Sequence, residues 1–303
     1  MENVAIDDNE TYLLLLLADG NLPTGSFVAS SGLESFLTHG FFGGSTDNLT
    51  STMNFIRDSV ATYARSALPF AADVHSVVMK MIADGCVDDL AEPLDRTCEK
   101  IKALDDLYEA MTLNHVARRA SKSQGVALLT LYTKGFSPPM SLPIKQMTTR
   151  DGLVGKLVDR YKLRIRREES QGHLPICWGI LTAALNLSLG KSCFECKPLN
   201  PHIYVLMPID RSLHLHLFLH ARSLLSAAVR LNTIGPYASQ QLLLHVIRPI
   251  VEAEFGNVKE LRTYTGEEIT RDEGVLDGPA TTWPLGEILA SRHDFQHSRI
   301  FNS

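Results

Sequence analysis

The stretch CEKIKALDDLYEAMTLNHVARRASKSQGVALLTLY, residues 98–132, decides the fold class. Its apolar and aromatic residues recur at intervals of three and four, at Ile101, Leu104, Tyr108 and Met111. This is the spacing of one face of an α-helix. We therefore expect a helix from about residue 97 to residue 133, where a Lys-Gly pair and then two prolines stop it.

The same periodicity extends over most of the chain. It predicts further helices at 46–67, 69–85, 175–189, 212–232 and 237–255, with Pro69 breaking the chain between the first two. No segment alternates like a strand, and no internal repeat is found. We expect an all-α protein, a single domain over residues 1–303, built as a bundle of roughly eight to ten helices. Two expected loops, at 134–150 and 256–284, interrupt it, and a tail at 292–303 ends it.

Composition limits the class of protein. The 303 residues are 45% hydrophobic and 21% charged, as in a folded globular chain. A net charge of −5 does not favour a nucleic-acid binder, and no apolar run is long enough to span a membrane. Five cysteines, an odd number scattered through the chain, favour a reducing compartment, so we expect a cytoplasmic protein.

Motifs for catalysis and metal binding are incomplete. LNLSLGKSC at 185–193 lacks the first glycine of a phosphate-binding loop, and VASSG at 28–32 lacks that of a nucleophile elbow. The basic run at 160–170 contains two glutamates and is interpreted as a solvated face. The sequence therefore predicts no catalytic constellation and no enzyme activity, and it implies no cofactor.

Two clusters leave a metal site open. Cys193 and Cys196 form a CxxC pair, but a structural zinc site needs a second pair, so a bland pair of thiols is the alternative. His214, His216 and His220 lie close together, and the last two are one helical turn apart. That spacing can chelate a transition metal, yet packing or interface histidines are the favoured interpretation. We predict no metal site.

Five motifs occur in an order that resembles one family. They are LPTGSF (22–27), SSGLE (30–34), GHLPICWGILTAALNLS (172–188), SAAVRLNTIGPYASQ (226–240) and HDFQHSRIFNS (293–303). The chain resembles the urease accessory protein F family, the helical chaperones of nickel insertion into urease. The tail departs from the family pattern by Asp294 for glutamate and Ile300 for leucine. The two long loops favour a eukaryotic, fungal member.

The resemblance implies a scaffold that acts through partners. It implies a homodimer that binds the accessory protein called UreD or UreH, recruits and regulates the GTPase UreG, and delivers nickel to apo-urease. Two alternatives stay open. One is a direct nickel metallochaperone that uses the cysteines and histidines above; the other is a GTPase-activating protein that supplies an arginine in trans.

The motifs also supply candidate site residues. Those expected to bind a partner are Glu34, Arg230, Gln240, Arg299, Phe301 and Ser303. Those expected to shape loops are Pro23, Gly25, Gly32 and Gly235. Arg230 has a helix cap as its alternative role. We expect Glu34 to lie near a helix start, where loss of its carboxylate costs only about 0.3–1 kcal/mol. We also expect Phe301 to lie unburied in a tail whose deletion leaves the melting temperature unchanged.

Overall fold

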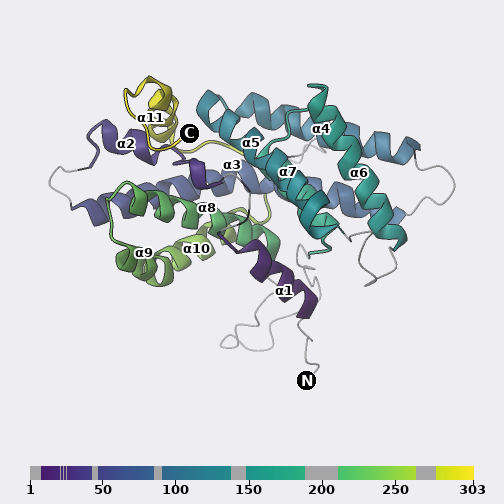
Figure 1. Ribbon diagram of the computed structural model, residues 1–303, viewed down its shortest axis with the longest axis horizontal. Helices are drawn as coiled ribbons and strands as arrows, with labels where there is room; N and C mark the ends of the chain where they lie inside the picture. The colour runs from purple at the N-terminus through teal and green to yellow at the C-terminus, as the bar shows by residue number, and fades with distance from the viewer. Residues whose placement is uncertain are drawn as a thin grey trace, which may run out of the picture.

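The computed structural model describes residues 8–20, 22, 24, 26–42, 47–84, 91–137, 148–187, 211–263 and 278–303. These residues form an all-α bundle without a strand among them, which confirms the predicted fold class (Figure 1). The helices are α1 (Asp8–Leu17), α2 (Leu33–Thr38), α3 (Asn48–Asp84), α4 (Ala91–Met111), α5 (His115–Leu131), α6 (Thr149–Arg166), α7 (Leu174–Ala184), α8 (Arg211–Arg230), α9 (Pro236–Leu242), α10 (Arg248–Val258) and α11 (Pro284–Ser291). Short 3₁₀ turns, Ser26–Val28 and Arg292–Phe295, precede α2 and follow α11.

Helix α7 lies in the core and packs against both α3 and α5. Its residues from Pro175 to Ala183 are all buried, in keeping with an almost continuous apolar sequence. Glycines permit the close packing. A Cβ on Gly179 would lie 2.6 Å from the carbonyl oxygen of Ala71 in α3, and one on Gly125 of α5 would lie 2.1 Å from that of Gly172. A side chain at either glycine would push α7 away from its neighbour.

Pro69 does not break the chain, contrary to the prediction. Helix α3 runs through it as one 37-residue element. Proline removes one hydrogen bond to the preceding turn. Here residues 67–72 are all buried, so apolar packing on both sides of the proline outweighs that loss.

The single helix expected over 97–133 is two helices. Asn114 lies between α4 and α5 and caps the second one, because its side-chain oxygen accepts hydrogen bonds from the backbone N–H groups of Val116 (3.0 Å) and Ala117 (3.2 Å). In the sequence, Asn114 was the residue that could have indicated the start of a second helix, because asparagine is a preferred N-cap. It lies inside a pattern whose apolar spacing continues past it, and so the periodicity concealed it.

A buried carboxylate joins α4 to the start of α7. Asp105 is 0% exposed and accepts a hydrogen bond from the hydroxyl of Tyr161 at 2.8 Å. It also accepts three backbone N–H groups, from Gln171 (2.8 Å), Gly172 (2.7 Å) and His173 (3.1 Å). Gly172 has a φ of 74°, a left-handed conformation that glycine adopts without strain. Asp105 therefore fixes the turn from which α7 begins.

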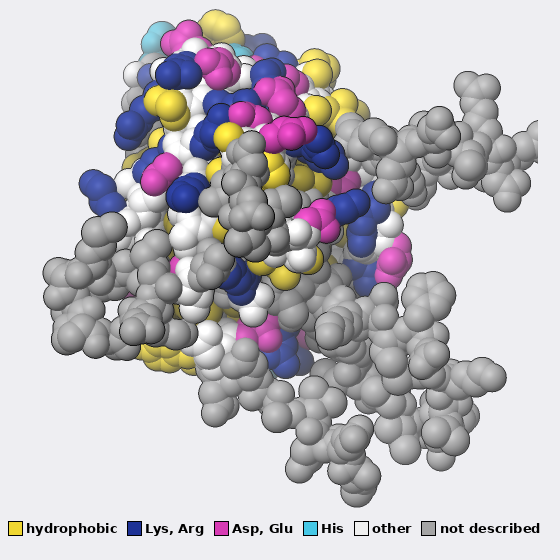
Figure 2. Space-filling model, turned by 90° about the vertical axis from the view of Figure 1, so that its right-hand side faces the viewer, with side chains coloured by type: hydrophobic (Ala, Val, Ile, Leu, Met, Phe, Trp, Pro, Cys, Tyr) yellow, Lys and Arg dark blue, Asp and Glu magenta, His cyan; other side chains and the backbone are white. Residues whose placement is uncertain are grey.

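The basic run at 160–170 belongs to α6 and the turn after it. Arg160 contacts Asp95 of α4 at 2.5 Å, and Arg164 contacts Glu99 at 2.7 Å. The side of the molecule that carries these helices shows basic and acidic side chains intermingled, as expected for a solvated face (Figure 2).

The expected loops are shorter in the structure. A π-helical turn spans Tyr132–Phe136 and α6 begins at Thr149, while α10 continues to Val258. Residues 138–147 and 264–277, which are parts of the two predicted loops, lie outside the described residues. So do Cys193 and Cys196.

Candidate functional site

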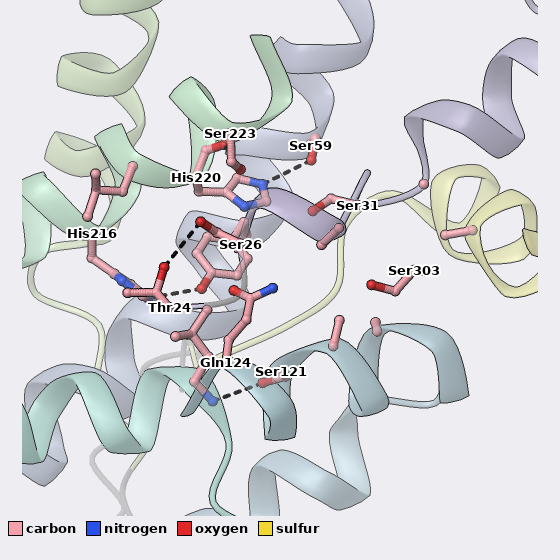
Figure 3. Close-up of a pocket in the computed structure, with 18 of the residues that line it drawn as sticks. Thr24, Ser26, Ser31, Ser59, Ser121, Gln124, His216, His220, Ser223 and Ser303 are labelled. Atoms are coloured by element: carbon pink, nitrogen blue, oxygen red, sulfur yellow. Dashed lines mark hydrogen bonds between the residues drawn. The ribbon is translucent and has the colours of Figure 1, made fainter. Parts of the chain in front are cut away.

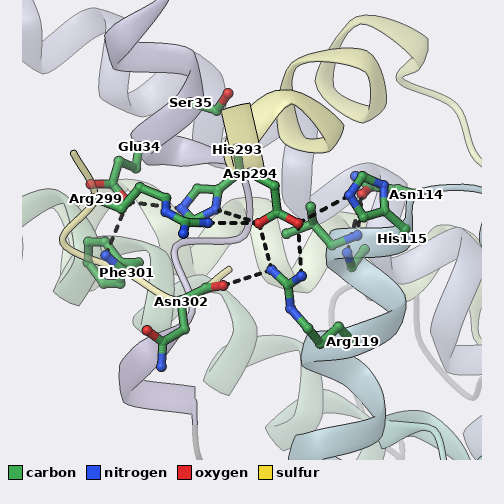
Figure 4. Close-up of polar contacts among 12 residues, drawn as sticks. Glu34, Ser35, Asn114, His115, Arg119, His293, Asp294, Arg299, Phe301 and Asn302 are labelled. Atoms are coloured by element: carbon green, nitrogen blue, oxygen red, sulfur yellow. Dashed lines mark hydrogen bonds and ion pairs between the residues drawn. The ribbon is translucent and has the colours of Figure 1, made fainter. Parts of the chain in front are cut away.

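The C-terminal segment, residues 292–303, is docked against the start of the chain, and Glu34 is its anchor (Figure 4). The Glu34 side chain is buried, and its carboxylate accepts backbone N–H groups from Ile300 at 2.6 Å and Phe301 at 3.1 Å. It also accepts the ring N–H of buried His293 at 3.0 Å. Glu34 does lie in the first turn of α2, as predicted, but its main role is to satisfy three donors of the tail.

Gly32 sets the direction of that anchor. It caps α2 with a φ of 88°, a left-handed conformation. A Cβ there would lie 2.8 Å from the Cβ of Ala290 in α11. The predicted loop role of Gly32 thus has two physical reasons, namely backbone conformation and the approach of α11. Gly235 caps α9 ahead of Pro236, whereas Pro23 and Gly25 lie outside the described residues.

A second carboxylate, Asp294, fixes the other side of the tail. Both its oxygens accept from the guanidinium of Arg119 on α5, each at 2.8 Å. Arg299 donates to it at 2.9 Å, and His115 lies 3.3 Å away. The hydrogen bonds from Arg119 hold the pKa of Asp294 well below its usual range. Arg119 also donates a hydrogen bond to the carbonyl oxygen of Asn302 at 2.9 Å, so this one side chain binds the tail at both Asp294 and Asn302.

Phe301 is buried, and the expectation that it lies unburied is wrong. It is 2% exposed, because the guanidinium of Arg230 packs on its ring, 4.1 Å from the centroid. The same guanidinium lies 3.8 Å from the ring centroid of Phe27, and it donates a hydrogen bond to the carbonyl oxygen of Phe27. Arg230 is therefore more than a helix cap, because it joins α8 to the tail and to the segment before α2, residues 26–32.

The last residues complete the docking. The N–H of Ser30 donates to an oxygen of Ser303 at 2.5 Å, and the N–H of Asn302 donates to the carbonyl oxygen of Val28 at 2.9 Å. The structure thus brings together five of the six candidate residues, Glu34, Arg230, Arg299, Phe301 and Ser303. Gln240 is exposed on α9, outside this cluster.

Sequence reasoning missed Arg119, His115 and the buried role of His293. Nothing in the local sequence around Arg119 distinguishes it from any other arginine on a helix. By contrast, His293 is part of the tail motif. Its buried role could not be predicted from the motif, because its partner Glu34 lies 259 positions away in the sequence.

The docked segment leaves apolar side chains exposed. Phe295 is 78% exposed, Ile300 is 61% exposed, and Ile288 on α11 is 60% exposed. Tail residues that anchor the segment and tail residues that face outward therefore alternate over a few positions.

A cavity of about 320 Å³ lies beside the segment before α2, residues 26–32 (Figure 3). His216 and His220 of α8 line it, and neither is a free ligand. A ring nitrogen of His216 contacts the hydroxyl of Tyr63 at 2.9 Å, and one of His220 contacts the hydroxyl of Ser59 at 3.1 Å. The ring of Tyr63 stacks on that of His220 with centroids 4.0 Å apart. This agrees with the packing interpretation of the histidines.

The described part of the chain was examined for side chains that could bind a metal ion together. No group of three or more His, Cys, Asp or Glu side chains there could hold a metal ion. His214, the third member of the cluster, packs edge-on against Phe255. Burial lowers the pKa of His216 to about 3 and that of His220 to about 4.

We expect the free energy of unfolding to fall as the pH drops from about 6.5 toward 4. Burial also lowers the pKa of His75 to about 4, whereas a histidine in the unfolded chain has a pKa of about 6.5. Between these values the unfolded state binds more protons, so acid favours unfolding. Denaturant titrations at about pH 7 and about pH 5 measure the loss.

The variant His75→Leu isolates one of these histidines. Neither ring nitrogen of His75 has a hydrogen-bond partner among the described residues, so leucine removes no bond. We expect the difference between the two pH values to shrink by about 1–2 kcal/mol in this variant. An unchanged difference would contradict the assignment of a neutral, buried His75.

Fold and site together define the class: an all-α protein whose C-terminal segment is locked onto its body by two carboxylates. Among the described residues no helix combines the length and the apolar character needed to cross a membrane.

Comparison with known proteins identifies the family. The UreF family model matches residues 47–194 and 205–247, more than half of the chain. Urease accessory protein 6 of Cryptococcus neoformans var. grubii is 42% identical, with 97% of each chain covered. An uncharacterized UreF-like urease accessory protein of Schizosaccharomyces pombe is 27% identical, also over 97% of each chain. The urease accessory protein UreF of Paenarthrobacter aurescens is 24% identical over 97% of this chain and 99% of its own. The chain belongs to the UreF family, and the 42% identical relative confirms that it is of the fungal kind.

Proposed function

We propose that this chain binds a UreD- or UreH-type accessory protein through its docked C-terminal segment, and that it recruits and regulates the GTPase UreG during nickel insertion into apo-urease. One observation carries the proposal: hydrogen bonds to Glu34 and Arg119 hold the segment in place while Phe295 and Ile300 remain mostly exposed. The relatives are named as urease accessory proteins, which supports a role in urease maturation. The proposal includes a cytoplasmic homodimer whose accessory role needs no enzymatic turnover of its own.

The docked segment has the physical properties of a binding surface. Exposed aromatic and aliphatic side chains next to arginines supply the contacts that dominate protein interfaces. Because the segment is already ordered by hydrogen bonds, a partner does not have to order it on binding, and this favours affinity. Arg299 lies at its edge and supplies a charge that orients a partner.

We expect the double variant Phe295→Ser/Ile300→Ser to weaken binding of the UreD- or UreH-type protein by about tenfold or more. Both side chains are mostly exposed, so the melting temperature should stay close to that of the unmodified chain. Co-purification and titration of the two proteins measure the effect. The matched control is Leu163→Ser, because Leu163 is 43% exposed on α6 and distant from the tail. Equal binding by all three proteins would place the interface elsewhere.

The two alternative functions make different predictions for the same proteins. A direct metallochaperone should bind nickel at micromolar concentration or tighter, and binding should disappear in His216→Ala/His220→Ala. We expect weak or no binding by the isolated chain, because the two imidazoles are engaged by Tyr63 and Ser59 and a pair of imidazoles alone holds a divalent ion poorly. A GTPase-activating protein should lose stimulated hydrolysis, but not UreG binding, when a single arginine is replaced.

A further inference from the structure

Outside the tail, a serine, a histidine and a glutamate form one hydrogen-bonded line. The hydroxyl of Ser121 lies 3.1 Å from Nδ1 of His173, and Nε2 of the same ring lies 2.7 Å from Oε2 of Glu109. The three residues come from α5, from the residue that precedes α7, and from α4. Their spacing in the sequence matches no hydrolase motif, which is why the sequence predicted no catalytic constellation.

The protonation states are fixed by the neighbours. A carboxylate only accepts hydrogen bonds, so Nε2 of His173 carries the proton and Nδ1 is left to accept the Ser121 hydroxyl. Burial lowers the pKa of His173, which keeps the ring neutral. Burial acts to raise the pKa of Glu109, but hydrogen bonds from Lys122 (3.0 Å) and His173 lower it overall, so this carboxylate is ionised. The backbone N–H of Leu174 donates to Ser121 Oγ at 3.0 Å and holds the oxygen in place.

Ser121 lines the 320 Å³ cavity described above (Figure 3). Gln124, one turn further along α5, also lines it and presents a carboxamide N–H donor to the same space. The other α5 residues that line the cavity are also uncharged: Val116, Ala117, Ala120 and Leu128. The charged side chains of the lining come from other segments: Asp19, Arg222, Arg230 and Glu287. The uncharged lining on the α5 side, beside Ser121, suits a small uncharged acyl compound better than a charged one.

We propose that Ser121, His173 and Glu109 form an acyl-transfer site that accepts small uncharged carboxylic esters. This proposal does not depend on partner binding. Ser121 Oγ attacks the ester carbonyl carbon as its proton passes to His173 Nδ1. The C–O bond to the alcohol breaks, and the alcohol leaves with that proton. Water then attacks the acyl group on Ser121, giving its proton to Nδ1; the carboxylic acid departs as Ser121 Oγ takes the proton back. Glu109 orients the ring and stabilises its positive charge.

The test uses the full chain and two probes. A fluorophosphonate, which reacts covalently with activated serines, should label the folded protein, and peptide mass spectrometry should place the label on Ser121. Hydrolysis of p-nitrophenyl acetate gives a second readout. We expect Ser121→Ala to abolish labelling and to lower hydrolysis by about tenfold or more, and Glu109→Gln to slow both.

A matched control distinguishes catalysis from a structural role. Ser123 lies on the same helix, two residues on, and is exposed, so Ser123→Ala should change neither readout. If Ser121 only caps α7 through Leu174, the unmodified chain will carry no label on Ser121. That result, which needs no variant to fold, would overturn the proposal. Hydrolysis that is equal in Ser121→Ala and in the unmodified chain would overturn it as well.

Discussion

Asp105→Ala is expected to destabilise the folded chain by about 3–5 kcal/mol, a large fraction of the stability of an ordinary domain. The carboxylate is fully buried and accepts four hydrogen bonds, three of them from consecutive backbone N–H groups before α7. Alanine leaves those N–H groups and the hydroxyl of Tyr161 without an acceptor in an interior where water cannot reach them. Because α7 packs on α3 and α5, disorder at its first turn loosens the whole core.

Chemical denaturation of the variant measures this loss directly, and the next residue provides the control. Asp106 is exposed and forms an ion pair with Lys102, one helical turn away. Asp106→Ala should therefore cost less than about 1 kcal/mol. Similar losses in the two variants would show that the Asp105 network contributes no more than a surface charge does.

Asp105 shows which contacts of a buried residue the helical pattern can predict and which it cannot. Ile101, Leu104 and Tyr108 define the buried stripe of α4, and Asp105 lies on that stripe, four residues after Ile101 and three before Tyr108. A carboxylate on a buried face must be paired, so the sequence could have indicated a buried acceptor here. It could not have indicated the donors, because the turn at 171–173 is more than sixty residues away in the chain.

Some helix boundaries could likewise be predicted from the local sequence, and others could not. The asparagine cap before α5 was readable from local chemistry, whereas the continuity of α3 through Pro69 was not. Local preference says that proline ends a helix, and only the burial of the residues on both sides of it, which is a tertiary property, reverses that preference.

At the candidate site, the sequence identified the pieces but not their contacts. Glu34, Arg230 and the tail were all singled out from motifs. That Glu34 accepts hydrogen bonds from His293 and Phe301 could not be read from them, since 259 or more positions separate these residues. When the partners of a charged residue are distant in the sequence, the local sequence shows only a charge near a helix end. Glu34 was therefore interpreted as a helix-dipole residue.

Glu34→Ala is the second large expected effect: we predict a loss of about 2–4 kcal/mol rather than the 0.3–1 kcal/mol of a helix-dipole residue. Alanine removes the acceptor from the N–H groups of Ile300 and Phe301 and from the ring of His293. The loss should be concentrated in the tail, whose amides become exchangeable while those of α7 stay protected. Hydrogen exchange measured by mass spectrometry compares residues 292–303 with α7. Because the tail makes these buried contacts, we now expect its deletion to lower the melting temperature.

Glu92 is the matched control for this prediction, because it too is an acidic residue in the first turn of a helix, but its side chain is 75% exposed. Glu92→Ala therefore measures the helix-dipole contribution, together with a weak pair to Arg96, and nothing of the tail. If Glu34→Ala loses no more stability than Glu92→Ala and leaves exchange in the tail unchanged, Glu34 is a helix-dipole residue. The docked segment is then held by its other contacts, those of Arg119 and Arg230 among them. If exchange rises across the tail and binding of the UreD- or UreH-type protein falls with it, the docked conformation is the one that the partner binds, because a released segment would have to be ordered again at the interface.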